Sequence, residues 1–195
     1  MSTPLGLLTF QKAIKGGVRP NLFEVLHGFP TGVTPPSISG VENGGEVTYM
    51  CKAAALPATN VGTVELPFRG RVLKVPGDRT YETWTGTFYM DDAFELRSAY
   101  EKWIELTNGV DTNTAAAGVG DCLIDVVVNQ LDKFEGSPDK LSIIRSYKLV
   151  SAFPVSVSQV SVAYDNNDSY EEFDVEFAYQ YHETTGGAGN NNVVG

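Results

Sequence analysis

Hydrophobic and polar residues alternate through much of the chain with a period of two, the pattern of half-buried β-strands. The alternation is clearest over residues 172–181. The hydrophobic face of this segment consists of Phe173, Val175, Phe177, Tyr179 and Tyr181. Its polar face includes Asp174, Glu176 and Gln180. Similar alternation or apolar runs bounded by turn residues predict strands over residues 19–25, 46–55, 61–75, 80–90, 122–131, 142–152 and 160–164.

Residues 61–90 are predicted to form a long hairpin. In the first strand Val64, Leu66, Phe68 and Val72 share one face, and Glu65, Arg69 and Arg71 share the other. The run Pro76-Gly77-Asp78-Arg79 is typical of a turn, because proline fixes φ and glycine accepts positive φ. The returning strand places Trp84, Phe88 and Met90 on one face and Thr83, Thr85 and Thr87 on the other.

One helix is predicted directly after the hairpin. Asp92 and Glu95 have the spacing of a capping box, and Asn108-Gly109 suits a left-handed helix end. Apolar residues recur between them at helical spacing, namely Ala93, Leu96, Tyr100, Trp103 and Ile104. The predicted fold is therefore mainly β, an antiparallel β-sandwich or barrel with one flanking α-helix and a long hairpin.

The 195 residues are expected to form a single domain over residues 1–183. A chain of this size buries roughly 70% of its unfolded surface. Residues 1–18 are predicted to form an N-terminal arm or short helix. Residues 28–45 are rich in Pro, Gly and Ser and are predicted to form a long loop. Loops of this length are usually either functional or disordered. The Gly/Asn-rich segment 184–195 is predicted to be a flexible tail.

The net charge of −10 argues against a surface that grips nucleic acid, which needs a basic stripe. The same charge is compatible with ordinary solubility and with a surface that avoids adhering to DNA. The two cysteines, Cys51 and Cys122, have no metal-ligand spacing and are expected to be buried reduced thiols, as in a reducing cytosol. No signal peptide, membrane span or cofactor site is predicted.

No catalytic constellation is found in the sequence. His27 and His182 are expected to be surface residues, and Trp84 and Trp103 core residues. The chain contains neither a G-x-S-x-G nucleophile motif nor a phosphate-binding loop. The sequence therefore predicts a protein that is not an enzyme.

The uncharged or acidic strand faces allow two interpretations. One face carries Thr83, Thr85 and Thr87, and another carries Asp174, Glu176 and Gln180. Each could be the solvated outer face that any antiparallel sheet possesses, or could line a channel. Asp78 and Arg79 could form an intrachain ion pair, an intersubunit contact or neither. The long hairpin, the 28–45 loop and the N-terminal arm exceed what one compact monomer needs, as expected of subunits that reach their neighbours.

An ordered series of segments resembles the tail tube proteins of contractile-tailed, T-even-like bacteriophages. The first three are Arg19-Pro-Asn-Leu-Phe-Glu-Val25, Cys51-Lys-Ala-Ala-Ala-Leu-Pro57 and Val75-Pro-Gly-Asp-Arg-Thr80 with Trp84. The next are Asp91-Asp92 and Tyr100-x-x-Trp103 of the predicted helix. The closing block comprises Ala152-Phe-Pro154, Val160, Tyr164-Asp-Asn166, Phe173-Asp-Val175 and Tyr181. The resemblance spans residues 19–183, and the 28–45 loop and the tail depart from the family pattern.

The resemblance implies hexameric rings whose inner sheets join into one multi-subunit β-barrel and stack into a hollow tube. It further implies a virion protein assembled in the host cytoplasm, with sheath, baseplate, tape-measure and tail-terminator proteins as partners. DNA would pass through the lumen without specific binding. We expect Thr83, Thr85, Thr87, Asp174, Glu176 and Gln180 to line the lumen. Subunit or ring contacts are expected at the 28–45 loop and at Arg19, Arg69, Arg71, Asp78 and Arg79.

Two further functions remain open at this point. One is a tube subunit of a phage-derived injection or secretion machine that carries a protein payload. The other is a monomeric β-sandwich binding module, which predicts an exposed aromatic cluster and a chain that stays monomeric at high concentration. An enzyme is the least favoured alternative.

Overall fold

The computed structural model describes residues 7–14, 17–36, 45–115, 118–137, 140–165, 167 and 169–186. Their helices are α1 (Leu7–Ile14), α2 (Gly45–Met50), α3 (Glu95–Thr107) and the 3-10 helix η1 (Val119–Cys122). Their strands are β1 (Phe23–Leu26), β2 (Cys51–Ala54), β3 (Asn60–Phe68), β4 (Arg71–Thr80), β5 (Trp84–Tyr89), β6 (Ile124–Ser137), β7 (Lys140–Val157), β8 (Glu172–Ala178) and β9 (Tyr181–Gly186). No helix among the described residues is both long and apolar enough to cross a membrane.

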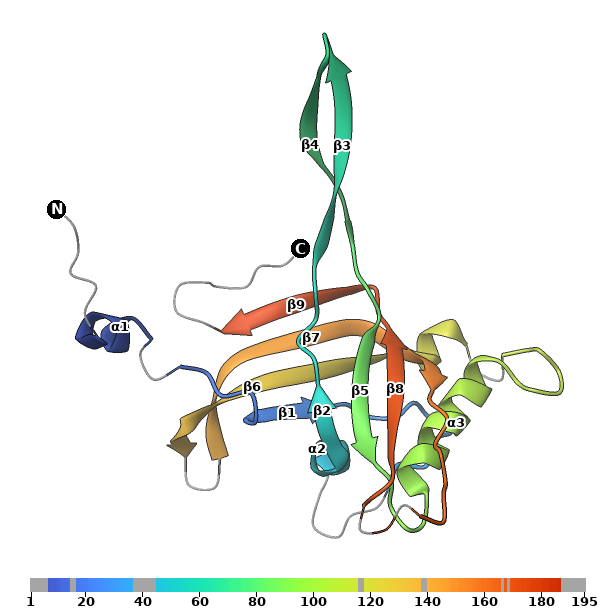
Figure 1. Ribbon diagram of the computed structural model, residues 1–195. Coiled ribbons are helices and arrows are strands. Elements are labelled where there is room, and N and C mark those ends of the chain that lie inside the picture. Colours follow the sequence, from blue (N-terminus) through green and yellow to red (C-terminus); the bar gives the residue numbers. More distant parts are fainter. Residues whose placement is uncertain are drawn as a thin grey trace.

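Two antiparallel layers share the long strand β7. The strands run in the order β1-β6-β7-β8-β5-β2, with β9 also paired to β7, and β3 and β4 form a separate two-stranded sheet. Residues 140–152 of β7 pair with β6, whereas residues 153–157 pair with β8. Figure 1 shows β2, β5 and β8 at a steep angle to β1, β6, β7 and β9. The mainly β, antiparallel prediction is confirmed, although one chain does not close a barrel by itself.

The bend of β7 allows it to belong to both layers. Ser151 has a positive φ of 54°, and the register shifts again between Pro154 and Ser156. Irregularities of this kind bend a strand and increase its twist. The strand predicted over residues 142–152 ends too early, because β7 continues through Phe153 and Pro154 to Val157 with β8 as its partner on one side. A proline at the edge of a sheet removes no ladder hydrogen bond.

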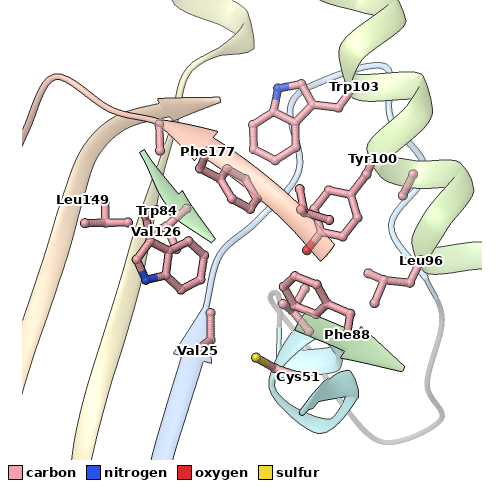
Figure 2. Packing of buried hydrophobic residues seen from close by; sticks show 14 of the residues in the cluster. Val25, Cys51, Trp84, Phe88, Leu96, Tyr100, Trp103, Val126, Leu149 and Phe177 are labelled. Carbon is pink, nitrogen blue, oxygen red and sulfur yellow. The ribbon is translucent and has the colours of Figure 1, made fainter. Parts of the chain in front are cut away.

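Helix α3 packs against the aromatic face of β5 and β8, as Figure 2 shows. The rings of Tyr100 and Phe88 are 5.5 Å apart, and those of Trp103 and Phe177 are 6.0 Å apart. The Trp103 indole N–H donates a hydrogen bond of 2.8 Å to the carbonyl of Cys122. Trp84 and Trp103 are both buried, so the prediction that the tryptophans belong to the core is confirmed.

The predicted capping box at the start of α3 is wrong in its residues. The Asp91 carboxylate, rather than that of Asp92, accepts hydrogen bonds from the backbone N–H groups of Glu95 and Leu96. Phe94, immediately before the helix, has a positive φ of 57°. The helix ends at Thr107 as the Asn108-Gly109 signal suggests, but Asn108 is extended rather than left-handed.

Three other predicted boundaries differ from the structure. Residues 45–50 form α2 rather than strand, because Val47, Met50 and Cys51 face the core at helical spacing. Residues 160–164 form no strand, and Val162 and Tyr164 are exposed. Residues 184–186 belong to β9, where Thr184 pairs with Tyr147, and the rest of the predicted tail lies outside the described residues.

His27 is buried, so the prediction that it lies on the surface is wrong. Its ring packs among Phe29, Trp103 and Phe177. The two ring nitrogens lie 2.8 Å from the Gly28 carbonyl and 2.8 Å from the Tyr100 hydroxyl. In the neutral ring, Nδ1–H donates to the carbonyl and Nε2 accepts from the tyrosine. Burial lowers the pKa of His27 from 6.5 to about 4.

The stability of the subunit is predicted to fall as the pH decreases from 6.5 to about 4. In this range the unfolded chain takes up a proton on His27 and the folded chain does not, so protonation favours unfolding. The loss should reach about 3 kcal/mol at the acid end. Urea unfolding over this pH range measures it. His27→Gln should remove this part of the pH dependence, and His182→Gln should retain it. An unchanged pH dependence in His27→Gln would contradict the assignment.

Gly86 is required by the aromatic core of β5. A Cβ atom at this position would lie 3.0 Å from Trp84 Cη2 and 3.1 Å from Phe88 Cζ. Gly86→Ala should therefore lower the free energy of unfolding by about 1–3 kcal/mol, because the packed rings must move. Gly28→Ala is the matched control, since a Cβ there meets no atom within 4 Å. Equal stability of the two variants in urea unfolding would refute the packing argument.

Candidate functional site

A polar surface covers the side of β5 and β8 that faces away from the aromatic core. In these paired strands Trp84, Phe88, Phe173 and Phe177 are buried, so the intervening residues point to the opposite side. Those residues include Thr85, Thr87, Asp174 and Glu176, with Thr85 opposite Glu176 and Thr87 opposite Asp174. The strand-face grouping made from the sequence is therefore correct for these four residues. The polar face is defined here as Lys52, Thr83, Thr85, Thr87, Ser156, Glu172, Asp174 and Glu176.

Hydrogen bonds hold the carboxylates of the polar face in place. The Thr87 hydroxyl donates to Asp174 Oδ1 at 2.7 Å, and the Thr83 hydroxyl donates to Glu176 Oε1. Ser156 Oγ donates to the other oxygen of Glu176 at 3.3 Å. These bonds orient the acids without neutralising them, so the face keeps its negative charge.

Lys52 and Glu172 are members of the polar face that the sequence interpretation missed. Their ion pair is 2.5 Å long, and the Glu172 carboxylate raises the pKa of Lys52. With Asp174 and Glu176, the charged side chains of the face sum to −2. Lys52 lies at an irregularity of β2, where the register shifts between Cys51 and Ala53, so strand alternation in the sequence does not predict its face.

Gln180 does not belong to the polar face. It lies in the turn between β8 and β9, where its backbone N–H donates to the carbonyl of Val150. Strand β8 ends at Ala178, so the alternation that starts at Phe173 does not continue to residue 180. The structure thus assembles five of the six residues predicted for the lumen on one surface and places Gln180 in the β8–β9 turn.

The long hairpin turns at Arg69-Gly70. These residues have φ angles of 47° and 80°, which is the signature of a two-residue type I′ turn. The turn predicted at Pro76–Arg79 is wrong, because these residues lie within β4, where Pro76 pairs with Thr63 and Arg79 with Val61 of β3. A proline is tolerated in β4 because each strand of this two-stranded sheet has a partner on one side only.

One face of the β3–β4 hairpin is exposed and largely apolar, with Arg71 opposite Phe68 near its tip. Val72 lies on the other face opposite Pro67, so the faces predicted for Arg71 and Val72 are wrong, because the turn at Arg69-Gly70 interrupts the alternation. We call Val64, Leu66, Phe68, Leu73 and Val75 the hairpin apolar face. Leu66 and Leu73 are cross-strand partners and are 50% and 61% exposed. The other face carries the Glu65–Lys74 ion pair at 3.2 Å. The expectation of a half-buried strand is therefore wrong for the isolated chain, since every described residue of β3 is exposed.

The residues predicted for subunit contacts lie in two separate regions. Arg69 is in the turn at the hairpin tip, Arg71 begins β4, and Asp78 and Arg79 lie near the hairpin base. Arg19 precedes β1, and its carbonyl accepts a hydrogen bond from the Gln130 side chain. In the 28–45 loop Pro30, Val33 and Pro36 are buried, and residues 37–44 lie outside the described part. The hairpin therefore gathers four of the five predicted residues.

The described residues contain no group of three or more His, Cys, Asp or Glu side chains that could hold a metal ion. Cys51 and Cys122 are buried and free, as predicted. Burial raises the pKa of the Cys51 thiol to about 12, which makes it a poor nucleophile at neutral pH. His182 is partly buried beside Tyr81, and burial lowers its pKa.

Comparison with known proteins identifies the family. The tail tube protein gp19 of Enterobacteria phage T4 is 27% identical over 165 residues, which cover 85% of this chain and 90% of the relative. The tail tube protein of Serratia phage KSP90 is 26% identical over 134 residues, covering 69% and 72%. A chain of the anti-feeding prophage baseplate has a similar fold, with a TM-score of 0.58, 14% identity and coverage of 95% and 98%.

The crystal structure of Hcp protein also has a similar fold, with a TM-score of 0.51, 14% identity and coverage of 87% and 96%. The family model described as phage tail tube protein matches residues 18–185 of the chain. The protein therefore belongs to the phage tail tube family.

Proposed function

We propose that the protein is the subunit of the inner tube of a contractile phage tail. Six copies form a ring, and rings stack into a hollow conduit for the genome. The observation that carries the proposal is the exposure of the hairpin apolar face. Its members include the large apolar side chains of Leu66, Phe68 and Leu73, which are exposed to solvent in the isolated chain. Exposed apolar surface on a projecting element marks a contact with another molecule. A tube subunit has such a contact with every neighbouring ring.

Ring closure in this proposal uses the open edges of one sheet layer. The layer β2-β5-β8-β7 has β2 at one edge and residues 153–157 of β7 at the other. Unpaired strand edges present rows of N–H and C=O groups that can pair with another chain. If β2 of one subunit lies beside the end of β7 of the next, the layer continues around the ring. The same operation repeated six times closes a barrel without an edge.

The polar face lines the lumen of such a barrel. The opposite side of the layer is covered by the core and α3, so the polar face is the side available to the bore. DNA carries one negative charge per about 1.7 Å of duplex, and a cationic bore would hold it. A surface of threonine hydroxyls and net negative carboxylates lets the genome pass. In this proposal DNA passes through the lumen without binding specifically to its wall.

The proposed partners follow from the place of the tube in the virion. A sheath protein wraps the tube, a baseplate begins it, and tape-measure and tail-terminator proteins limit its length. Subunits fold and assemble in the host cytoplasm, and the role is structural rather than enzymatic. Support comes from the phage relatives and from the sixfold-symmetrised anti-feeding prophage baseplate, whose chain shares the fold.

A tube subunit of an injection or secretion machine is the second candidate. The observation that favours it is the fold shared with the anti-feeding prophage and Hcp protein structures. Sequence identity to those chains is 14%, against 27% to the T4 tail tube protein over 165 residues. The higher identity favours a phage tail and DNA as cargo.

The hairpin apolar face is predicted to serve assembly and not folding. Leu66→Ser with Leu73→Ser should abolish tubes while changing the free energy of unfolding of the subunit by less than about 1 kcal/mol, because both side chains are already solvated. Arg79→Glu should weaken assembly in the same direction. Leu149→Ala, at a fully buried position, should instead cost about 2–5 kcal/mol of stability. Sedimentation velocity and urea unfolding measure the two effects.

An exposed site outside the hairpin provides the control for charge. Lys133 is an exposed residue of β6. Lys133→Glu should leave both the sedimentation of the tubes and the free energy of unfolding of the subunit unchanged. Tubes of normal abundance in the Leu66→Ser, Leu73→Ser variant would contradict the proposed role of the hairpin in assembly.

A further inference from the structure

We propose that the hairpin tip of one subunit docks on the β7–β8 loop, through its described residues 158–165 and 169–171, of a subunit in the next ring. The inference deepens the proposed function, on which it rests, by naming the surface that receives the hairpin. The acceptor is a second copy of this chain. Its chemistry combines exposed tyrosines with carboxylates, and the hairpin tip combines arginines with apolar side chains.

The hairpin and the β7–β8 loop lie at opposite ends of the subunit. In the β5–β8 ladder Trp84 pairs with Phe177 at one end, and Tyr89 pairs with Glu172 at the other. The hairpin leads into Trp84, whereas the loop leads into Glu172, where the Met90 N–H donates to the Glu171 carbonyl. The ladder between them is about 17–20 Å long. Figure 1 shows the hairpin rising from one end, with the residues that precede β8 at the other.

The β7–β8 loop exposes large side chains that contribute nothing to the core. Val162 is 79% exposed, Tyr170 is 84% exposed and Tyr164 is fully exposed. Tyrosine is enriched in protein interfaces because its ring buries a large area while its hydroxyl keeps a polar partner. Three such side chains on one short connection form a surface that another chain can cover.

The two elements carry opposite charge. Residues 60–80 contain four basic residues, Arg69, Arg71, Lys74 and Arg79, and two acids, Glu65 and Asp78, which gives +2. The described residues of the 158–171 segment include the acids Asp165 and Glu171 and no basic residue, which gives −2. The hairpin is thus positive in a chain whose net charge is −10. Opposed patches of this kind orient two copies head to tail and disfavour hairpin-to-hairpin contact.

The side chains at the two surfaces have matching chemistry. The Arg69 guanidinium lies over the Phe68 ring, with 5.3 Å between its central carbon and the ring centroid. Within the described residues, neither Arg69 nor Arg71 forms an ion pair. A guanidinium can stack on a tyrosine ring and bind a carboxylate at the same time. Arg69 and Arg71 can therefore engage Tyr164, Tyr170 and Asp165, while Leu66 and Leu73 cover Val162.

A contact between different surfaces of identical copies repeats without limit. The hairpin of each subunit binds the β7–β8 loop of a subunit in the next ring. At one end of the stack the loops of the last ring remain free, so each can bind the hairpin of a further subunit. This arrangement gives a role to the exposed side chains of the hairpin and to those of the β7–β8 loop. It predicts that the polarity of the tube is set by the direction in which the hairpin points.

Reversing the charge of each surface tests the pairing. Variant one carries Arg69→Glu and Arg71→Glu, and variant two carries Asp165→Lys and Glu171→Lys. Each variant alone places like charges at the contact, so the mass of tubes pelleted from it should fall at least tenfold relative to the unsubstituted protein. An equimolar mixture should restore tubes, because the acidic hairpin of variant one meets the basic loop of variant two, and the converse contact is also complementary.

Controls separate this inference from the proposed function. Asp92→Lys with Asp111→Lys makes the same charge change at exposed positions outside the loop, and should leave tubes intact and fail to restore variant one. Restoration by the mixture also shows that both variants fold. If the unsubstituted protein forms tubes and the mixture does not, the docking inference is wrong and the tube function stands. Absence of rings and tubes from the unsubstituted protein overturns the proposed function itself.

Discussion

The packing of α3 against β5 and β8 is the interaction on which the remaining surfaces depend. Tyr100 and Trp103 cover Phe88 and Phe177 on one side of the layer, and burial of such rings is the dominant stabilising contribution in a chain of this size. Helix α3 packs on that side only, which leaves the other side polar. The single-sided core thus makes a layer with one solvated face and two open edges, a form that suits closure into a larger barrel.

The sequence predicts the parts of the fold that follow from strand parity. Phe173, Val175 and Phe177 are buried as the alternation indicates, and Thr85 lies beside Glu176 on the opposite side. The prediction from sequence fails where a tertiary contact decides whether a side chain is buried. The β3–β4 hairpin has the alternation of a half-buried strand because its apolar residues share a face, but none of the residues that the structure describes covers that face.

Other misassignments have local causes of the same kind. Arg69 adopts positive φ at the hairpin tip, which its residue type does not signal, whereas Pro76-Gly77 looks like a turn and lies in a strand. His27 is buried because aromatic rings from α3, β8 and the loop after β1 enclose it and the Tyr100 hydroxyl satisfies one nitrogen. Lys52 lies at the register shift between Cys51 and Ala53, which strand alternation does not predict. The hydrophobic periodicity of the sequence does not predict any of these contacts.

The central claim is that identical subunits form a hollow tube whose bore is lined by the polar face. Electron cryomicroscopy of the purified protein over a concentration series tests it most directly. The account predicts stacked rings with sixfold end views, and a reconstruction in which Asp174 and Glu176 face the bore while α3 lies outside. A monodisperse monomer at every concentration, or a tube with the Asp174 and Glu176 side turned outward, would contradict it.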